Sequence, residues 1–169
     1  MVDDSFYRAA RRLAARRLSR DRAQFSITPT DLIHSSVEKL LKAGHDLEAM
    51  DKDEAQRMLA QSYHHILIDR ARRRNSQKRG GGQESLQWVT EFEDPKLRLP
   101  MVDLLSYLEV LDRLGEHAPR EAEVVKLKIY LQLTFKEIGD IVGCSEKTAR
   151  SDYQAALSFM RVKLEGKSE

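Results

Sequence analysis

An all-α fold is predicted by three features of this sequence. Apolar residues recur at intervals of three and four along seven segments, which is the spacing of one face of an α-helix. No segment alternates between apolar and polar residues for long enough to indicate a strand. Proline and glycine fall mainly at the ends of these segments, where helices begin and stop. With 169 residues, 41% of them apolar, the chain can build one ordinary domain or two small helical ones.

The first two predicted helices cover residues 3–22 and 30–44. The first carries seven arginines among regularly spaced apolar residues and is therefore basic and amphipathic. In the second, Thr30 can cap the helix, Pro29 stands just outside it, and Gly44 is the expected stop. The apolar stripe of this second helix consists of Ile33, Val37, Leu40 and Leu41.

The third predicted helix, residues 53–75, ends in a cluster of basic residues. Its inward stripe consists of Ala55, Leu59, Ser62, Tyr63, Ile66, Leu67 and Arg70. The helix dipole favours positive charge at a C-terminus, and this accounts for one or two of the cations. Six cations lie within ten residues, and their mutual repulsion indicates an anionic partner. They are Arg70, Arg72, Arg73, Arg74, Lys78 and Arg79.

A connector follows, beginning with three glycines at positions 80–82. Its weak periodicity, together with Pro95 and Pro100, predicts a flexible linker over residues 80–100, in which Trp88 and Phe92 make simple docking contacts. Four further helices are expected at residues 101–116, 119–131, 134–142 and 145–164. The predicted architecture is thus two small helical domains, residues 1–79 and 101–169, joined by this linker.

Charge is distributed unevenly between the two predicted domains. Up to Gly82 the chain has 17 Lys and Arg against 11 Asp and Glu, whereas the remainder has 12 against 16. This segregation indicates two units with different partners, of which the first faces a polyanion. A solvated arginine face is the alternative interpretation.

The most informative stretch is "LTFKEIGDIVGCSEKTARSDYQAALSFMRVKL", which predicts a helix-turn-helix in the C-terminal domain. A short helix meets a tight turn at Gly143, and Ser145 then caps a second helix. Ala149, Tyr153 and Ala156 are expected to face inward with Leu157 and Met160. The exposed first turns of a recognition helix enter the major groove of DNA. The candidate DNA-binding residues here are Ser145, Glu146, Lys147, Thr148, Arg150 and Ser151. Few basic residues follow Arg150 in this helix, so a low affinity for DNA is expected from this domain alone.

Catalytic, metal and cofactor sites are not predicted. A single cysteine, Cys144, excludes an internal disulfide and a multi-cysteine zinc site, and it is expected to be a small buried residue. The histidines do not form a metal-binding pair, and His64 and His65 are expected to be satisfied and partly exposed. The N-terminal "MVDDSFYRAARR" lacks a secretion signal and no apolar run is long enough to span a membrane, so a cytoplasmic location is expected.

Three stretches carry a resemblance to a known family. They are "RRLAARRLSRDRAQFSITPTDLIHSSVEKLL", "ILIDRARRRNSQKRGGG" and "LTFKEIGDIVGCSEKTARSDYQAAL". In this order, separated by a linker, they resemble the extracytoplasmic-function (ECF) sigma factors of the sigma-70 family. Within that family the chain is most similar to the planctomycete-type group.

The resemblance implies a function in transcription initiation, with core RNA polymerase and promoter DNA as partners. It implies that residues 1–79 dock on the polymerase and engage the minus-ten element, and that residues 101–169 read the minus-35 element. The arginines from Arg70 to Arg79 would then meet the promoter backbone. The segment matching the polymerase-binding helix contains Asp31, Leu32, His34, Val37, Glu38 and Leu41. A monomeric free protein is expected, and an anti-sigma partner is left open.

Two further interpretations stay open, and neither is an enzyme. The stretch "AGHDLEAMDKDEA" contains no aromatic residue, although a captured, unstacked base needs a stacking surface or a pocket. This absence allows a divergent sigma-like protein that binds polymerase or DNA but does not melt promoters. The other alternative is a conventional helix-turn-helix regulator that binds DNA as a dimer. The asymmetric build and the lack of a dimerisation heptad argue against it.

Overall fold

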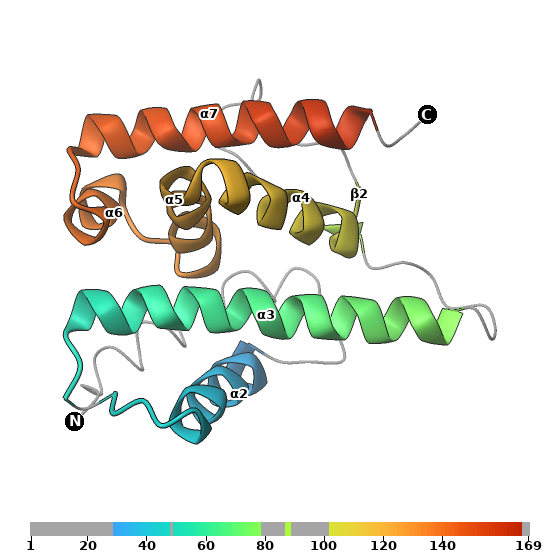
Figure 1. The fold of residues 1–169 in the computed structure, drawn as a ribbon, viewed down its shortest axis with the longest axis horizontal. Helices are drawn as coiled ribbons and strands as arrows, with labels where there is room; N and C mark the ends of the chain where they lie inside the picture. The colour runs from blue at the N-terminus through green and yellow to red at the C-terminus, as the bar shows by residue number, and fades with distance from the viewer. Residues whose placement is uncertain (1–28, 48, 79–86, 89–101, 167–169) are drawn as a thin grey trace.

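The computed structural model describes residues 29–47, 49–78, 87–88 and 102–166 of the chain (Figure 1). Within these ranges the chain forms six helices and one pair of two-residue strands, which confirms the all-α prediction. The helices are α2 (Pro29–Lys42), α3 (Lys52–Lys78), α4 (Leu104–His117), α5 (Pro119–Tyr130), α6 (Phe135–Val142) and α7 (Glu146–Glu165). The helix expected at residues 3–22 lies outside the described residues, as does most of the expected linker.

Helix α3 forms a middle layer of the described structure. Figure 1 shows it between α2 and the C-terminal helices, with α7 on the far side of α4 and α5. Two clusters of buried apolar side chains hold this arrangement. One packs Leu67, Ile68 and Ala71 of α3 against α4, α5 and α7. The other packs Leu59 and Tyr63 against α5 and α6. Because burial of apolar surface is the main favourable contribution to folding, α3 and the C-terminal helices depend on one another.

Part of the expected linker pairs with the start of the C-terminal helices. Strand β1 (Gln87–Trp88) lies antiparallel to β2 (Val102–Asp103), with Trp88 opposite Val102. The backbone of Trp88 thus pairs with that of Val102. The docking contact expected of its side chain stays a prediction, and Phe92 lies outside the described residues. The boundaries of the two domains and the linker stay a prediction.

The limits of α2 and α3 differ slightly from the predicted ones. Pro29 is the first residue of α2 instead of preceding it, and Thr30 lies within the helix instead of capping it. Proline suits the first turn because a backbone N–H there has no intrahelical partner. Gly44 follows the end of α2 with a φ of +84°, as expected of a stop. Helix α3 continues to Lys78, since no strong helix breaker precedes the glycines at 80–82.

A buried polar network joins α3 to α4 and α5. His64 has no exposed surface, which corrects the prediction that it is partly exposed. Asp112 can only accept a hydrogen bond when ionised, so His64 Nε2 donates to Asp112 Oδ1 at 2.6 Å. The Tyr130 hydroxyl then donates to His64 Nδ1 at 2.7 Å. Burial, aided by the positive charge of Lys126, lowers the pKa of His64 to about 4 and keeps the ring neutral.

Polar contacts continue towards the N-terminal end of α3. Arg57 Nε lies 3.1 Å from Glu123 Oε1 in an ion pair, and its guanidinium also donates to the carbonyl of Ile141 at the end of α6. Lys126 Nζ donates to Gln61 Oε1 at 2.7 Å. These contacts hold α3 to α5 and α6 beside the apolar clusters.

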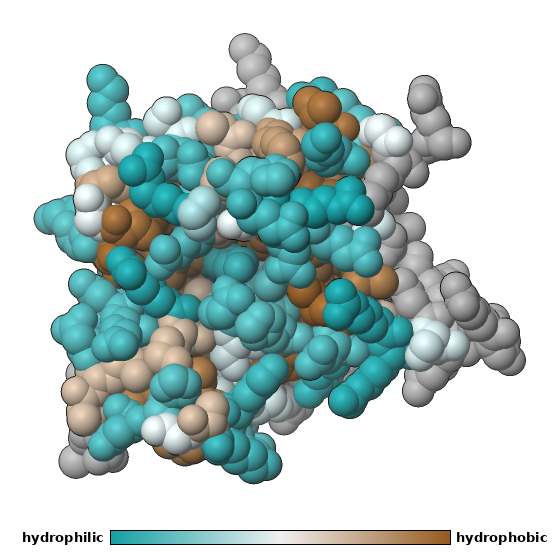
Figure 2. Space-filling view, viewed as in Figure 1, coloured by the Kyte–Doolittle hydropathy of each residue, from teal (hydrophilic) through white to brown (hydrophobic). Residues whose placement is uncertain are grey.

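Polar side chains cover most of the surface seen in Figure 2. Among the described residues, the large apolar side chains that are most exposed are Leu41 and Val162, at 56% and 67%. Leu41 belongs to the predicted apolar stripe of α2 but is exposed. Leu40, also in the predicted stripe, is buried, because adjacent residues on a helix point about 100° apart. No helix in the described part of the chain is both long and apolar enough to cross a membrane.

Candidate nucleic-acid interface

Two glycines shape the turn between α6 and α7. Gly143 has a φ of +74°, a left-handed conformation that side chains with a Cβ rarely adopt. Gly139 permits a close approach of the backbone, because a Cβ there would lie 2.6 Å from the Cys144 carbonyl oxygen. The Cys144 N–H donates to the Gly139 carbonyl at 2.9 Å. Two helices joined by so tight a turn have the form of a helix-turn-helix.

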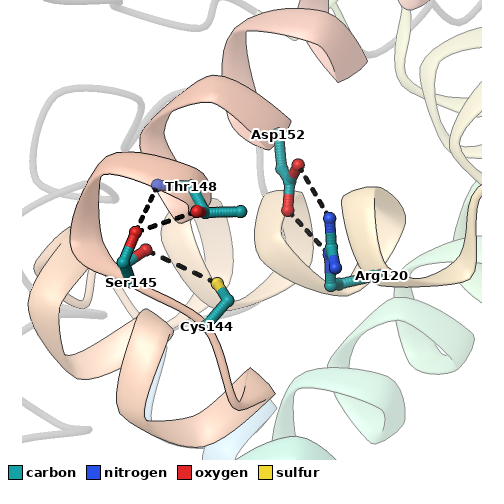
Figure 3. A network of polar contacts seen from close by, with 5 residues as sticks. All are labelled: Arg120, Cys144, Ser145, Thr148 and Asp152. Atoms are coloured by element: carbon teal, nitrogen blue, oxygen red, sulfur yellow. Dashed lines mark hydrogen bonds and ion pairs between the residues drawn. The ribbon is translucent and has the colours of Figure 1, made fainter.

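The first turn of α7 is fixed by a side-chain cap (Figure 3). Ser145 Oγ accepts a hydrogen bond from the Thr148 N–H at 3.0 Å and lies 2.8 Å from Thr148 Oγ1. The cap predicted at Ser145 is therefore confirmed. Cys144 is half-buried, and its Sγ lies 3.5 Å from the Ser145 carbonyl oxygen. Because their hydroxyls serve the cap, Ser145 and Thr148 position the helix in addition to any contact with DNA.

Helix α6 begins with a complete capping box. Thr134 Oγ1 accepts from the Glu137 N–H at 3.3 Å, and Glu137 Oε2 accepts from the Thr134 N–H at 2.7 Å. The hydrogen bonds from Thr134 lower the pKa of Glu137. The start of α6 is therefore set before any partner binds.

Helix α7 presents one apolar face to the core and one polar face to solvent. The inward residues Ala149, Ala156, Leu157, Met160 and Leu164 are buried. The first two turns expose Glu146, Lys147, Arg150 and Ser151. The structure thus brings these four candidate residues together on one accessible surface, here called the recognition face.

Asp152 does not belong to the recognition face, although its sequence position follows Ser151. Its side chain turns inward and is held by Arg120 from the first turn of α5 (Figure 3). Arg120 Nε donates to Asp152 Oδ2 at 2.8 Å, and Nη2 donates to Oδ1 at 3.2 Å. This two-point pair fixes α7 against α5, since both carboxylate oxygens are engaged. The hydrogen bonds raise the pKa of the Arg120 guanidinium.

Arg150 is the long cation at the edge of the recognition face. Its guanidinium carbon lies 4.6 Å from the ring centroid of Phe135 in α6, and its Nη2 lies 3.4 Å from Glu146 Oε1. Lys128 Nζ lies 4.7 Å from the centroid of the same ring. Sequence reasoning does not find Phe135 or Lys128, because the loop between α5 and α6 removes any helical spacing that would connect them with Arg150.

The basic end of α3 forms a second candidate surface. Arg72 and Arg73 are exposed there, and Arg70 is half-buried. Arg74 and Lys78 belong to the same helix, but the structure does not describe their side chains. Arg79 lies outside the described residues. Figure 1 places this end of α3 and the first turns of α7 at opposite ends of the molecule, so the structure does not unite the two sets.

The predicted polymerase-binding residues share α2. His34, Glu38 and Leu41 are exposed, whereas Val37 is half-buried and packs towards the core cluster that includes Leu59. Glu38 pairs with Lys42 at 2.6 Å, and this lowers the pKa of Glu38. The two other predicted polymerase-binding residues are Asp31 and Leu32, whose side chains the structure does not describe. Helix α2 thus presents a mixed polar and apolar edge.

The comparisons with known proteins give the chain its class. Among the described residues, no three His, Cys, Asp or Glu side chains are grouped to hold a metal ion. A fold of this kind, all-helical with a helix-turn-helix near its end, is found in DNA-binding transcription proteins. The family model described as "ECF sigma factor" matches residues 3–166, and the chain therefore belongs to this family. No curated protein and no solved structure matches it.

Membership of the ECF sigma factor family defines the general function of this chain. ECF sigma factors are DNA-binding proteins that act with RNA polymerase in transcription initiation, and their family is not a family of enzymes. The planctomycete-type subgroup stays a prediction.

Proposed function

We propose that this protein binds core RNA polymerase and directs transcription from a specific set of promoters. The observation that carries the proposal is the recognition face, whose Lys147 and Arg150 stand exposed on a helix that is capped at Ser145 and anchored through Asp152. A helix held in this way can place side chains against base edges in the major groove. We assign this face to the minus-35 element.

The basic end of α3 is proposed to bind the backbone near the minus-ten element. Arginine neutralises phosphate whatever the base sequence, so exposed residues such as Arg72 and Arg73 supply affinity and position. The edge of α2 that includes His34, Glu38 and Leu41 is proposed to dock on the polymerase, because an exposed leucine among polar residues suits a protein contact.

A second candidate function rests on the segment between α2 and α3. Residues 43–55 contain no aromatic side chain on which an unstacked base could stack. A divergent protein that binds polymerase and DNA without opening the promoter would fit this absence. A helix-turn-helix regulator acting as a dimer is the other alternative.

The deciding experiment is in vitro transcription on a pooled genomic promoter library with core polymerase from the same organism. We expect new transcripts that share an upstream pair of motifs. A variant with Lys147→Ala and Arg150→Ala should keep polymerase binding and lose the upstream preference. Polymerase binding without transcripts would establish the divergent regulator. A dimer that binds DNA but not polymerase would support the conventional regulator.

A further inference from the structure

The ring of Phe135 is contacted by two cations from different helices. Arg150 approaches it from α7 and Lys128 from α5, with distances to the ring centroid of 4.6 Å and 4.7 Å. Tyr153 adds a tilted aromatic contact at 5.5 Å between centroids. The ring therefore joins α5, α6 and α7 at the edge of the recognition face.

The position of this ring is set by the fold and not by a ligand. Phe135 is the first residue of α6 and directly follows the capping residue Thr134. It is 8% exposed and belongs to the same buried cluster as Leu133 and Ile138. A ring held in this way offers a fixed, electron-rich face.

Arg150, in contrast, is half exposed and has a long side chain with many rotamers. Its ion pair with Glu146 spans 3.4 Å at the surface, where such pairs stabilise little. The guanidinium stacked on Phe135 is attracted to the negative face of the ring. Restricting Arg150 before DNA arrives reduces the conformational entropy that binding would otherwise cost.

Lys128 differs from Arg150 in that its second anchor within the protein is a backbone carbonyl. Its Nζ donates to the Leu133 carbonyl at 3.1 Å, which directs the ammonium group to the loop before α6. The side chain of Lys128 is half-buried, whereas that of Arg150 is exposed. Of the two cations on this ring, Arg150 is the one that can reach DNA without breaking a backbone contact.

We propose that Phe135 is a positioning residue for DNA recognition, whose ring holds Arg150 in the conformation that binds the upstream promoter element. The proposal rests on the proposed function, since it requires that the recognition face binds DNA. It assigns specificity to a largely buried residue that does not itself touch a base.

The test changes the charge distribution of the ring while keeping its shape. The full-length chain is prepared with mono-, di- and pentafluorophenylalanine at position 135. The same series at Phe159 serves as the control, because this ring also contacts a cation, Lys163 Nζ at 5.7 Å, but lies further along α7 than the recognition face. The probe is the duplex that the wild-type protein selects from a random-sequence pool. Circular dichroism establishes that each variant is folded.

We expect affinity for the selected duplex to fall stepwise with fluorination at Phe135, by about two- to fivefold in total. The matched series at Phe159 should leave affinity unchanged. In an Arg150→Ala background, fluorination at Phe135 should have no further effect. Phe135→Leu, which removes the ring and keeps an apolar side chain, should broaden the selected sequence as Arg150→Ala does.

The outcomes separate this inference from the proposed function. A flat fluorination series, or a series that persists without Arg150, would show that Phe135 serves packing only and would overturn the inference. In that case an altered sequence preference in Arg150→Ala would still support the proposed function. If the wild-type protein selects no sequence at all, this inference is overturned, whereas the proposed function is decided by transcription with core polymerase.

Discussion

The two helices proposed to meet DNA, α3 and α7, are built in opposite ways. Helix α7 has one buried face and one exposed face, and its candidate residues lie on the exposed face. Helix α3 is buried on several sides through its middle, and its exposed arginines Arg72 and Arg73 lie near its end. Between described residues, neither of these two arginines forms an ion pair within 4 Å. Arg150, in contrast, is restrained by both Phe135 and Glu146.

This difference matches two kinds of DNA contact. Base recognition depends on the position of each side chain, so a few restrained residues suffice. Phosphate neutralisation depends on the amount of charge, which exposed arginines supply. We therefore expect changes in the middle of α3 to act on folding, and changes at its end or on the recognition face to act on binding.

The largest expected effect comes from the core that α3 shares with the C-terminal helices. Leu127 of α5 has no exposed surface and lies in the same cluster as Leu59 and Tyr63 of α3. Leu127→Ala should lower the free energy of unfolding by about 2–5 kcal/mol, measured by chemical denaturation. Leu41→Ala, at an exposed site, should change it by no more than about 0.5 kcal/mol.

Hydrogen exchange in Leu127→Ala sharpens the comparison of the two helices. If they share one core, amides of α3 and α7 should lose protection together, because a small domain unfolds cooperatively. Wild-type protection in α3 alongside lost protection in α7 would show that the two helices belong to independent units.

The second expected effect is a dependence of stability on pH that originates in α3. The folded-state pKa of His64 is lowered to about 4 from its ordinary 6.5. Between these two pH values the unfolded chain therefore binds a proton that the folded chain does not bind. Stability is therefore fully present above pH 6.5 and falls as the pH decreases towards 4. The loss attributable to His64 is on the order of 3 kcal/mol.

Denaturation curves at several pH values check this assignment. His64→Gln should reduce the stability at neutral pH but flatten its decline in acid. The same change at the exposed His117 of α4 serves as the control and should leave the decline in place. An equally steep decline in His64→Gln would mean that other groups, such as His65 or the capping carboxylate of Glu137, cause it.

Much of the fold could be predicted because its signals are local. The limits of the four C-terminal helices follow from apolar spacing, from Pro119 at the start of α5 and from the turn at Gly143. Helix α3 was predictable for the same reason, including most of its inward stripe. The packing of α3 on α4 and α5 was not, because it depends on residues far apart in sequence, and it is this packing that buries His64.

In the candidate site, too, contacts between residues far apart in sequence could not be predicted from local signals. The exposed positions Lys147, Arg150 and Ser151 follow from helical periodicity, but the binding of the neighbouring Asp152 to Arg120 does not. Nothing in the spacing of these two residues, 32 positions apart, indicates an ion pair. The contact between Arg150 and Phe135 likewise depends on how the helices cross.

The third effect concerns the cap that fixes the first turn of α7. Ser145→Ala removes the acceptor of the Thr148 N–H and should cost about 1 kcal/mol of stability. Ser158→Ala, which removes a hydroxyl bonded to the Gln154 carbonyl within the same helix, should cost no more than about 0.5 kcal/mol. Thermal unfolding of both variants measures the difference, and equal losses would contradict a special role for the cap.

The smallest effect on stability is expected where the effect on DNA binding is broad. Arg72, Arg73 and Arg74 changed together to alanine should leave the free energy of unfolding nearly unchanged, because this end of α3 is exposed at Arg72 and Arg73. DNA affinity should fall for all sequences alike. The slope of log affinity against log salt should decrease in magnitude by about 3, close to one unit for each lost phosphate contact. Titrations at several salt concentrations measure this slope.

The change of Lys147 and Arg150 to alanine is the matched experiment on α7, because it removes a similar amount of charge from the other surface. It should alter which sequences are preferred, whereas the arginine variant of α3 should preserve the preference and lower the affinity. If the salt slope is unchanged in the α3 variant, the arginines do not contact phosphate. Non-specific binding would then have to be assigned to other basic residues, and α3 would not have the phosphate-binding role proposed for it.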